Sequence, residues 1–188
     1  PIIVRALPSL QHELVNQGYT TDFLCGGDVS FTITKGYLVN MDFQKITADV
    51  NFTKEERKTN SWGVNDHITF AYLARNLLDR KNNLTAGSSE KPWFSAFLTL
   101  SCHEPFTVPY HRLSDEVYNA AAYTDDCLGK FIKQLKASPL WNNLLIILVP
   151  DHNITYNMAD SNPDYFKCPM LWIGGAVKGN PRVISKFM

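Results

Sequence analysis

Strand-sized apolar runs alternate with segments of helical period along this chain of 188 residues, and no other feature of the sequence constrains the fold as strongly. The runs lie at residues 21–25, 93–100, 143–149 and 169–173. The run at 93–100 is expected to be a buried strand, and the last two runs are typical of central parallel strands that are covered on both faces. A helix between two strands returns the chain to the end of the sheet where the first strand began. Such strands therefore pair in parallel. The sequence therefore predicts an α/β fold, with a mostly parallel sheet and helices on both faces.

Two segments show the helical period most clearly, at 64–78 and 114–137. In the second, apolar side chains recur every three or four positions, which predicts a helix with Ser114 as its N-cap. Asp115 and Glu116 then lie in the first turn, where the helix dipole favours negative charge.

The residues around position 64 are expected to start the first of these helices. Trp62 is expected to pack against the fold, and Asp66 to complement the positive end of the helix dipole. His67, beside it, is expected to be an exposed surface residue.

Three shorter segments complete the pattern. Residues 9–17 predict a short helix that Ser9 caps. Residues 31–40 fit either a short helix or an irregular connector, and residues 53–58 are expected to be polar and solvated.

The composition excludes several classes of protein. Because 18 Lys and Arg balance 18 Asp and Glu, the chain lacks the basic excess of a nucleic-acid-binding protein. A hydrophobic content of 45% excludes disorder. No run reaches the roughly 18 to 20 apolar residues that span a bilayer, so the chain itself is expected to be soluble. The four cysteines lack CxxC spacing and fit buried thiols as well as disulfides.

Polar side chains follow three of the apolar runs. Asp28 comes after the first, His103 after the second, and the pair Asp151 and His152 after the third. In an open parallel sheet, ligands bind outside the carboxyl ends of the strands. The sequence therefore predicts that these side chains converge on one edge of the sheet.

Each of these residues has a functional and a purely structural interpretation. Asp151 and His152 offer a carboxylate oxygen and an imidazole nitrogen, which suit Zn, Mn or a similar cation, or they form a solvated turn. His103 fits a general acid or a donor to a phosphate or sulfate group, or it caps a loop by bonding to the backbone. Asp28, after two glycines, is typical of a turn residue. The sequence contains no serine nucleophile elbow, dinucleotide-binding glycine motif, P-loop or HExxH motif.

Five motifs in order resemble the sulfatase-type branch of the alkaline phosphatase superfamily. They are Phe23-Leu24-Cys25-Gly26-Gly27-Asp28-Val29-Ser30-Phe31, Trp62-Gly63-Val64-Asn65-Asp66, Leu98-Thr99-Leu100-Ser101-Cys102-His103-Glu104-Pro105-Phe106, Tyr123-Thr124-Asp125-Asp126 and Val149-Pro150-Asp151-His152. The resemblance is greatest to lipoteichoic-acid-synthase-like phosphoglycerol transferases and to related membrane sulfatases. It runs from about residue 7 to about residue 175.

The resemblance implies phosphoryl or sulfuryl transfer at a divalent metal (Mn, Mg, Zn or Ca), on an anionic ester linked to a lipid or a glycan. In this family a Thr, Ser or formylglycine nucleophile attacks, and the covalent intermediate passes to water or an alcohol. By position in the motifs, Asp151 and His152 resemble the metal ligands and His103 the substrate-site histidine. The parent protein is then expected in the cell membrane, with its catalytic domain periplasmic or extracellular.

The first departure from the family pattern concerns the nucleophile. The family's nucleophile and its first acidic metal ligand would precede Pro1, and no motif for either occurs in the chain. Residues 1–188 are therefore expected to be one truncated catalytic domain, an alkaline-phosphatase-like fold whose N-terminal part is missing. It is expected to bind metal weakly or not at all and to be inactive alone. A sheet left with an uncovered edge favours a homodimer.

The second departure concerns the substrate. Cys25 stands where phosphoglycerol-handling members have a His, and residues 32–34 lack their Trp and Arg. Without that Arg a bidentate grip on a second phosphate is lost, and we expect Asp28 to face a sugar or glycerol hydroxyl instead.

Two other functions stay open. A pseudo-enzyme or sensor domain of the same fold would bind an anionic lipid or glycan without turnover, and the residues before Pro1 would distinguish it from an enzyme. An unrelated α/β binding module would require the ordered motifs to coincide by chance.

Overall fold

The computed structural model of this protein describes residues 8–30, 34–57, 59–82, 91–152 and 167–184. In chain order the elements are α2 (Leu10–Asn16), β1 (Thr20–Cys25), α3 (Thr34–Asn40), β2 (Lys45–Thr47), η2 (Asp49–Asn51), α4 (Lys54–Arg57), α5 (Asp66–Asn82), β3 (Trp93–Leu98), α6 (Glu116–Lys136), η3 (Pro139–Asn143), β4 (Ile146–Leu148) and β5 (Leu171–Ile173). By their internal contacts these form two compact units, Pro1–Gln134 and Leu135–Met188.

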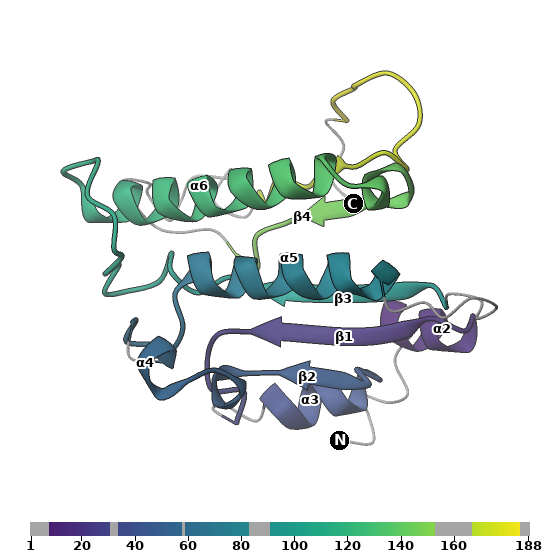
Figure 1. Ribbon diagram of the computed structural model, residues 1–188, viewed down its shortest axis with the longest axis horizontal. Helices are drawn as coiled ribbons and strands as arrows, with labels where there is room; N and C mark the ends of the chain where they lie inside the picture. Colours follow the sequence, from purple (N-terminus) through teal and green to yellow (C-terminus); the bar gives the residue numbers. More distant parts are fainter. Residues whose placement is uncertain (1–7, 31–33, 58, 83–90, 153–166, 185–188) are drawn as a thin grey trace. The chain divides into compact units, whose positions relative to one another are not determined.

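A parallel three-stranded sheet forms the centre of the first unit, with the strand order β2-β1-β3 (Figure 1). In its register, Leu24 of β1 lies between Thr47 of β2 and Phe97 of β3. The predicted parallel pairing is confirmed here. The strand β3, predicted to be buried, is only half-buried along most of its length, since in the described part of the chain it pairs with β1 alone.

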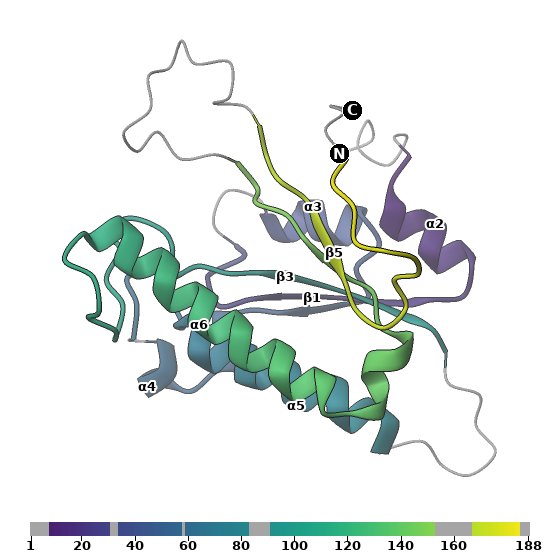
Figure 2. The same ribbon diagram turned by 90° about the horizontal axis from the view of Figure 1, so that it is seen from above.

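Helices cover both faces of this sheet, with α3 on one side and α5 on the other (Figure 2). Side chains alternate along β1, because successive residues of a strand point to opposite faces. Phe23 packs on Phe43 at 5.5 Å between ring centroids, and it joins the core that contains Leu38 of α3. On the other face, Asp22 forms an ion pair with Arg80 of α5. The predicted helices on both faces are confirmed in this unit.

The helix α6 lies beside α5 (Figure 2). Phe70 of α5 meets Phe97 of β3 edge-on, with ring centroids 4.8 Å apart, and Phe131 of α6 at 5.4 Å. Phe70 and Phe131 are each only 6% exposed. Burying an aromatic side chain of this size contributes about 1.5–3 kcal/mol, so this stack is a main source of the unit's stability.

One of two predicted helix caps differs from the sequence prediction. The helix α6 begins at Glu116, and its cap is Asp115, whose Oδ1 accepts a hydrogen bond from the backbone N–H of Tyr118 at 3.1 Å. Ser114 was therefore the wrong cap, since both residue types suit an N-cap and the helix starts one residue later. The short helix at the amino end, α2, is capped by Ser9 as predicted.

The segment predicted to be solvated, 53–58, contains the helix α4. Thr53 Oγ1 accepts from the N–H of Glu56 at 3.2 Å, and Glu56 Oε2 accepts from the N–H of Thr53 at 2.8 Å. This reciprocal pair is a capping box, so the start signal was present in the sequence. The segment at 31–40, for which two interpretations were open, contains the helix α3.

The second unit contains η3 and the antiparallel pair β4 and β5, in which Ile147 lies opposite Trp172. Central parallel strands covered on both faces were predicted here, and that prediction is wrong for the described residues. Ile147 is 43% exposed and Trp172 is 56% exposed. An apolar run identifies a strand but carries no information on the direction of its partner.

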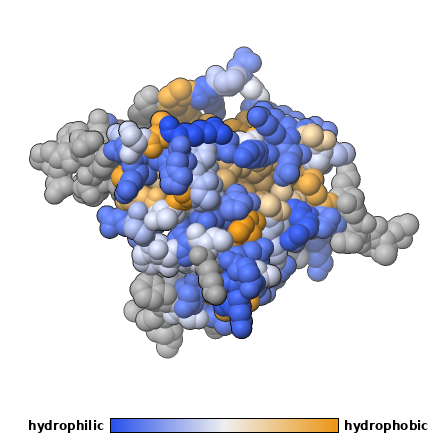
Figure 3. Space-filling model, turned by 60° about the vertical axis from the view of Figure 1, so that its left-hand side comes forward, coloured by the Kyte–Doolittle hydropathy of each residue, from blue (hydrophilic) through white to orange (hydrophobic). Residues whose placement is uncertain are grey.

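No helix in the described ranges is both long and apolar enough to cross a bilayer. All four cysteines are free thiols: Cys25 and Cys127 are buried, and Cys102 and Cys168 are exposed. On the face shown in Figure 3, polar side chains cover most of the surface, and apolar side chains gather in patches between them.

Candidate functional site

Two loops of the first unit meet at the carboxyl end of β1. Gly63 has a φ of 139°, and a Cβ placed there would lie 2.2 Å from the carbonyl oxygen of Gly26. That same oxygen accepts a hydrogen bond from the N–H of Val64 at 3.0 Å. Only glycine tolerates both this backbone conformation and this contact. The loop after β1 is therefore held directly against the loop before α5.

A buried carboxyl group joins these loops to the rest of the unit. Asp66 is 0% exposed, and its Oδ1 accepts from the N–H of Leu100 at 2.9 Å. Its Oδ2 accepts from Thr124 Oγ1 of α6 at 2.8 Å. The N–H of Ser101 lies 3.3 Å from both oxygens, and Ser101 Oγ accepts from the N–H of Asp66 at 3.0 Å. Asp66 does start α5, but its main role is to bond α5, α6 and the loop after β3 together.

His103 lies on the loop after β3, against the indole of Trp62. The two ring centroids are 4.2 Å apart, with the planes tilted by 52°. His103 Nδ1 lies 3.0 Å from the carbonyl oxygen of Glu104, and Trp62 Nε1 donates to this same oxygen. Among the described residues nothing bonds His103 Nε2, and the side chain is exposed. The ring thus bonds to backbone, as the structural interpretation expected, and still offers one nitrogen to a ligand.

Asp28 lies on the loop after β1 and is exposed. Its Oδ1 accepts from the N–H of Ser30 at 2.7 Å, which is the turn geometry expected of an Asp at this point. A Cβ on the neighbouring Gly27 would lie 3.1 Å from the carbonyl oxygen of Trp62. The loops that carry Asp28 and His103 therefore both lie close to Trp62.

Cys25 occupies the end of β1, where the resemblance expects a histidine. Its side chain is buried, and burial raises the pKa of the thiol. The N–H of Gly27 lies 3.4 Å from its sulfur. A buried, neutral thiol packs in the core and offers no charge to a substrate.

Asp151 and His152 lie in the second unit, shortly after β4. Their side chains are 68% and 76% exposed, and His152 Nε2 lies 3.6 Å from Asp151 Oδ2. One carboxylate oxygen and one imidazole nitrogen so close together fit two ligands of a divalent cation. Within the described ranges no group of three or more His, Cys, Asp or Glu could hold a metal. This pair alone is too small for a complete ligand set, and both its metal-binding role and its convergence with Asp28 and His103 stay predictions.

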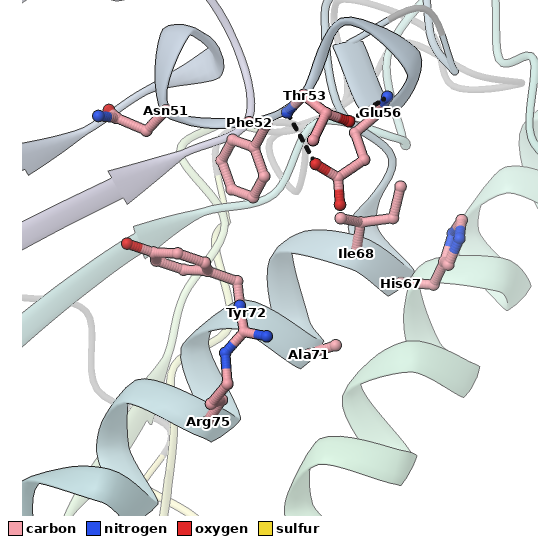
Figure 4. Close-up of a pocket in the computed structure, with 9 residues that line it drawn as sticks. All are labelled: Asn51, Phe52, Thr53, Glu56, His67, Ile68, Ala71, Tyr72 and Arg75. Atoms are coloured by element: carbon pink, nitrogen blue, oxygen red, sulfur yellow. Dashed lines mark hydrogen bonds between the residues drawn. The ribbon is translucent and has the colours of Figure 1, made fainter.

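A hollow of about 340 Å³ opens between α4 and α5 (Figure 4). Its lining residues are Asn51, Phe52, Thr53, Glu56, His67, Ile68, Ala71, Tyr72 and Arg75. None of the four predicted site residues belongs to it. His67 at its rim is exposed as predicted, but its Nδ1 lies 2.6 Å from Tyr123 Oη of α6, and burial lowers the pKa of the imidazole.

Comparison with known proteins shows which family has this architecture. A family model described as Sulfatase matches residues 3–171. The chain is 23% identical over 160 residues to lipoteichoic acid synthase 1 of Bacillus subtilis, a match that covers 79% of this chain and 23% of that protein.

Two solved structures share the fold. A protein of the alkaline phosphatase superfamily from Vibrio parahaemolyticus superposes with a TM-score of 0.77 at 27% identity, over 93% of this chain and 45% of that one. The lipoteichoic acid synthase LtaP of Listeria monocytogenes superposes with a TM-score of 0.74 at 20% identity, over 88% of this chain and 46% of that one. The chain thus spans less than half the length of each of these relatives. Its match to the family model and its α/β architecture agree, and the chain belongs to the sulfatase family, with the fold of the alkaline phosphatase superfamily.

Proposed function

We propose that this chain is part of a metal-dependent enzyme that transfers phosphoryl or sulfuryl groups, and that its substrate is an anionic ester linked to a lipid or a glycan. The observation that carries the proposal is His103, held on Trp62 with Nε2 open, at the carboxyl edge of a parallel sheet in a sulfatase-family chain. In α/β folds this edge is where ligands bind. The match to lipoteichoic acid synthase 1 supports an ester of the cell envelope as the substrate.

The described residues take separate roles in this proposal. His103 donates from Nε2 to an oxygen of the transferred group when the ring is protonated, which steadies the charge that develops there. Asp28, an exposed residue with one oxygen bonded in its turn, accepts a hydrogen bond from a sugar or glycerol hydroxyl. Cys25 is a packing residue.

Asp151 and His152 would hold the divalent cation (Mn, Mg, Zn or Ca). Such an ion neutralises charge on the transferring group and activates the nucleophile. Two ligands bind a cation weakly, since structural and catalytic metal sites use three or more protein ligands. The chain of 188 residues is therefore proposed to bind metal weakly and to be inactive alone, because it contains no nucleophile motif.

For the whole protein, we propose a place at the cell membrane, with this part outside the cytoplasm. The substrate class requires that position, because lipid-linked envelope esters lie there. The edge strand β3 offers unpaired backbone groups in the described part of the chain, which favours a homodimer. Sedimentation velocity of the 188-residue chain tests this last point, and a monomer at all concentrations would contradict it.

Titration with inorganic phosphate and with sulfate tests the site. We expect either anion to shift the ring ¹⁵N resonances of His103. The anion that binds with the lower dissociation constant should indicate the transferred group. The variant His103→Gln should lose the effect, and His111→Ala, which removes another exposed histidine, should keep it. Unchanged anion binding in His103→Gln would refute the role of this residue.

Paramagnetic Mn²⁺ tests the metal site. It should broaden the resonances of Asp151 and His152 first, and Asp151→Asn should weaken this effect while Asp79→Asn, on an exposed part of α5, leaves it unchanged. Turnover of a chromogenic phosphodiester or sulfate ester above the blank, abolished by Asp151→Ala, would contradict the proposed inactivity of the isolated chain.

A non-catalytic binding domain of the same fold is the second candidate. The buried Cys25 favours it, because a family position that carries a polar ring in phosphoglycerol-handling members is here a neutral thiol. A chain extended to the length of its relatives decides between the two. Hydrolysis of the chromogenic phosphodiester or sulfate ester supports the enzyme, and anion binding without hydrolysis supports the sensor.

A further inference from the structure

Two contacts between Trp62 and the loop after β3 act on the same imidazole. The indole lies against the His103 ring at 4.2 Å between centroids, and its Nε1–H donates to the carbonyl oxygen of Glu104. That oxygen is also the partner of His103 Nδ1. One aromatic side chain therefore contacts both the ring and the acceptor that orients it.

The shared acceptor determines where the imidazole carries its proton. A carbonyl oxygen only accepts hydrogen bonds, so the hydrogen of this bond belongs to His103 Nδ1. In the neutral ring Nε2 then carries the lone pair, and a second proton, when it binds, goes to Nε2. The carbonyl oxygen has two lone pairs and so accepts from Nδ1 and from Trp62 Nε1 together.

The backbone of Trp62 is itself held in place. Its N–H donates to Asn60 Oδ1 at 2.8 Å, and the next residue, Gly63, contacts Gly26 at the end of β1. The side chain is 39% exposed, so it is more open than a core tryptophan would be. Trp62 is thus a large aromatic residue that is only partly buried, on a loop that backbone contacts hold in place. Its Nε1–H bonds to the neighbouring loop. These features indicate a role other than filling the core.

We propose that Trp62 is a positioning residue: it holds the His103 ring in one orientation and in the Nδ1–H form, so that Nε2 faces the ligand. The inference rests on the proposed function only in taking His103 as the group that meets the substrate. It links the loop before α5 to a ligand-binding role that neither the motif pattern nor the family match assigns to it.

Two substitutions distinguish the effect of the Trp62 ring on His103 from the effect of apolar side-chain volume alone. Trp62→Phe keeps an aromatic ring against His103, and Trp62→Leu keeps apolar volume without a ring. The histidine tautomer and the ring-proton shifts are read from ¹H–¹⁵N spectra of the 188-residue chain, with His103→Gln to identify the signals. We expect the wild-type chain to show the Nδ1–H form and upfield-shifted ring protons. Trp62→Leu should lose both, and Trp62→Phe should retain most of each.

Trp93→Phe is the matched control, because Trp93 lies in the same unit and stacks on Arg80 rather than on a histidine. It should leave the His103 signals unchanged. Wild-type tautomer and ring-proton shifts in a folded Trp62→Leu chain would overturn the inference. If Trp62→Leu fails to fold, Trp62→Met takes its place, because it also keeps apolar volume without a ring and should show the same losses. Wild-type tautomer and ring-proton shifts in a folded Trp62→Met chain would overturn the inference.

Inorganic phosphate separates this inference from the proposed function. Trp62→Leu should raise the dissociation constant for phosphate, read from the shift of His103, by about two- to tenfold, because one side chain must then be ordered on binding. If phosphate leaves His103 unshifted in the wild type, the proposed function fails while the tautomer result stands. If phosphate binds Trp62→Leu as tightly as wild type, the positioning role fails while the function stands.

Discussion

The two units of the chain bury their apolar side chains to very different extents. In the first, Leu24 of β1 is 3% exposed and Phe70 of α5 is 6% exposed. In the second, Ile147 of β4 and Leu171 of β5 are 43% and 55% exposed. Three parallel strands with helices on both faces enclose a core, whereas two antiparallel strands of three residues each do not.

This difference bears on the two pairs of predicted site residues. Asp28 and His103 lie on loops tied to the well-packed unit through Gly26, Trp62 and Asp66. Asp151 and His152 follow a short, exposed strand. A bound cation would therefore order its ligands far more than a bound anion would order His103.

The largest expected effect compares one aromatic residue from each unit. Phe70→Ala removes the ring that contacts Phe97 and Phe131, and should lower the free energy of unfolding by about 3–5 kcal/mol. Trp172→Ala removes a side chain that is 56% exposed, and should change it by less than about 1 kcal/mol. Urea unfolding followed by tryptophan fluorescence measures both. Equal losses would contradict the contrast between the units.

Asp66 tests whether a polar network adds to the stability of the first unit. Asp66→Ala leaves the N–H groups of Leu100 and Ser101 and the hydroxyl of Thr124 without their acceptor, at a total cost of about 3 kcal/mol. Asp79→Ala, at an exposed position of the same helix, should change stability by less than about 0.5 kcal/mol. Thermal and urea unfolding give the comparison, and similar values for both variants would show that the network is unimportant.

A glycine in each unit sharpens the comparison further. Gly63 and Gly174 both have positive φ, and a Cβ would lie 2.2 Å from the carbonyl oxygen of Gly26 and 2.0 Å from that of Leu144, respectively. Each Gly→Ala change should destabilise its own unit by about 1–3 kcal/mol. Hydrogen exchange should then increase within that unit only. Gly129→Ala on α6, where the Cβ meets open space, should instead stabilise by about 0.5–1 kcal/mol.

The smallest effect is a pH dependence confined to the first unit. Burial lowers the pKa of His67 below its ordinary value of 6.5, so the unfolded chain binds this proton more readily than the folded chain. The contribution of neutral His67 to the free energy of unfolding is full above pH 6.5, and it is lost as the pH falls from there toward the pKa of His67 in the folded chain. His67→Gln should flatten the fall in melting temperature between about pH 8 and about pH 5, and His111→Gln should not. A fall of equal size in both variants would assign the effect to other groups.

The elements of the first unit were predictable because their signals are local. The apolar run at 21–25 became β1, and the helical period that starts near Asp66 became α5. The capping box of Thr53 and Glu56 was equally local and could have predicted α4. The direction of the partner of β4 was not predictable, since it depends on which strand the run meets.

The candidate site shows the same division. The places of Asp28 and His103 follow from the rule that ligands bind at strand carboxyl ends, and the structure has both on loops that lie close to Trp62. The bonding role of Asp66 could not be predicted, because its partners Ser101 and Thr124 are 35 and 58 positions away along the chain. No motif spacing encodes such contacts.

The contact between Gly26 and Gly63 restricts how this chain can be recombined with its relatives. A Cβ at Gly26 would lie 2.7 Å from the carbonyl oxygen of Val64, and one at Gly63 would meet Gly26 even more closely. Neither loop can therefore accept a side chain at this point while the other keeps its path. A chimera that takes residues 26–28 from one parent must take residues 60–65 from the same parent, or the two grafted segments will not fit together.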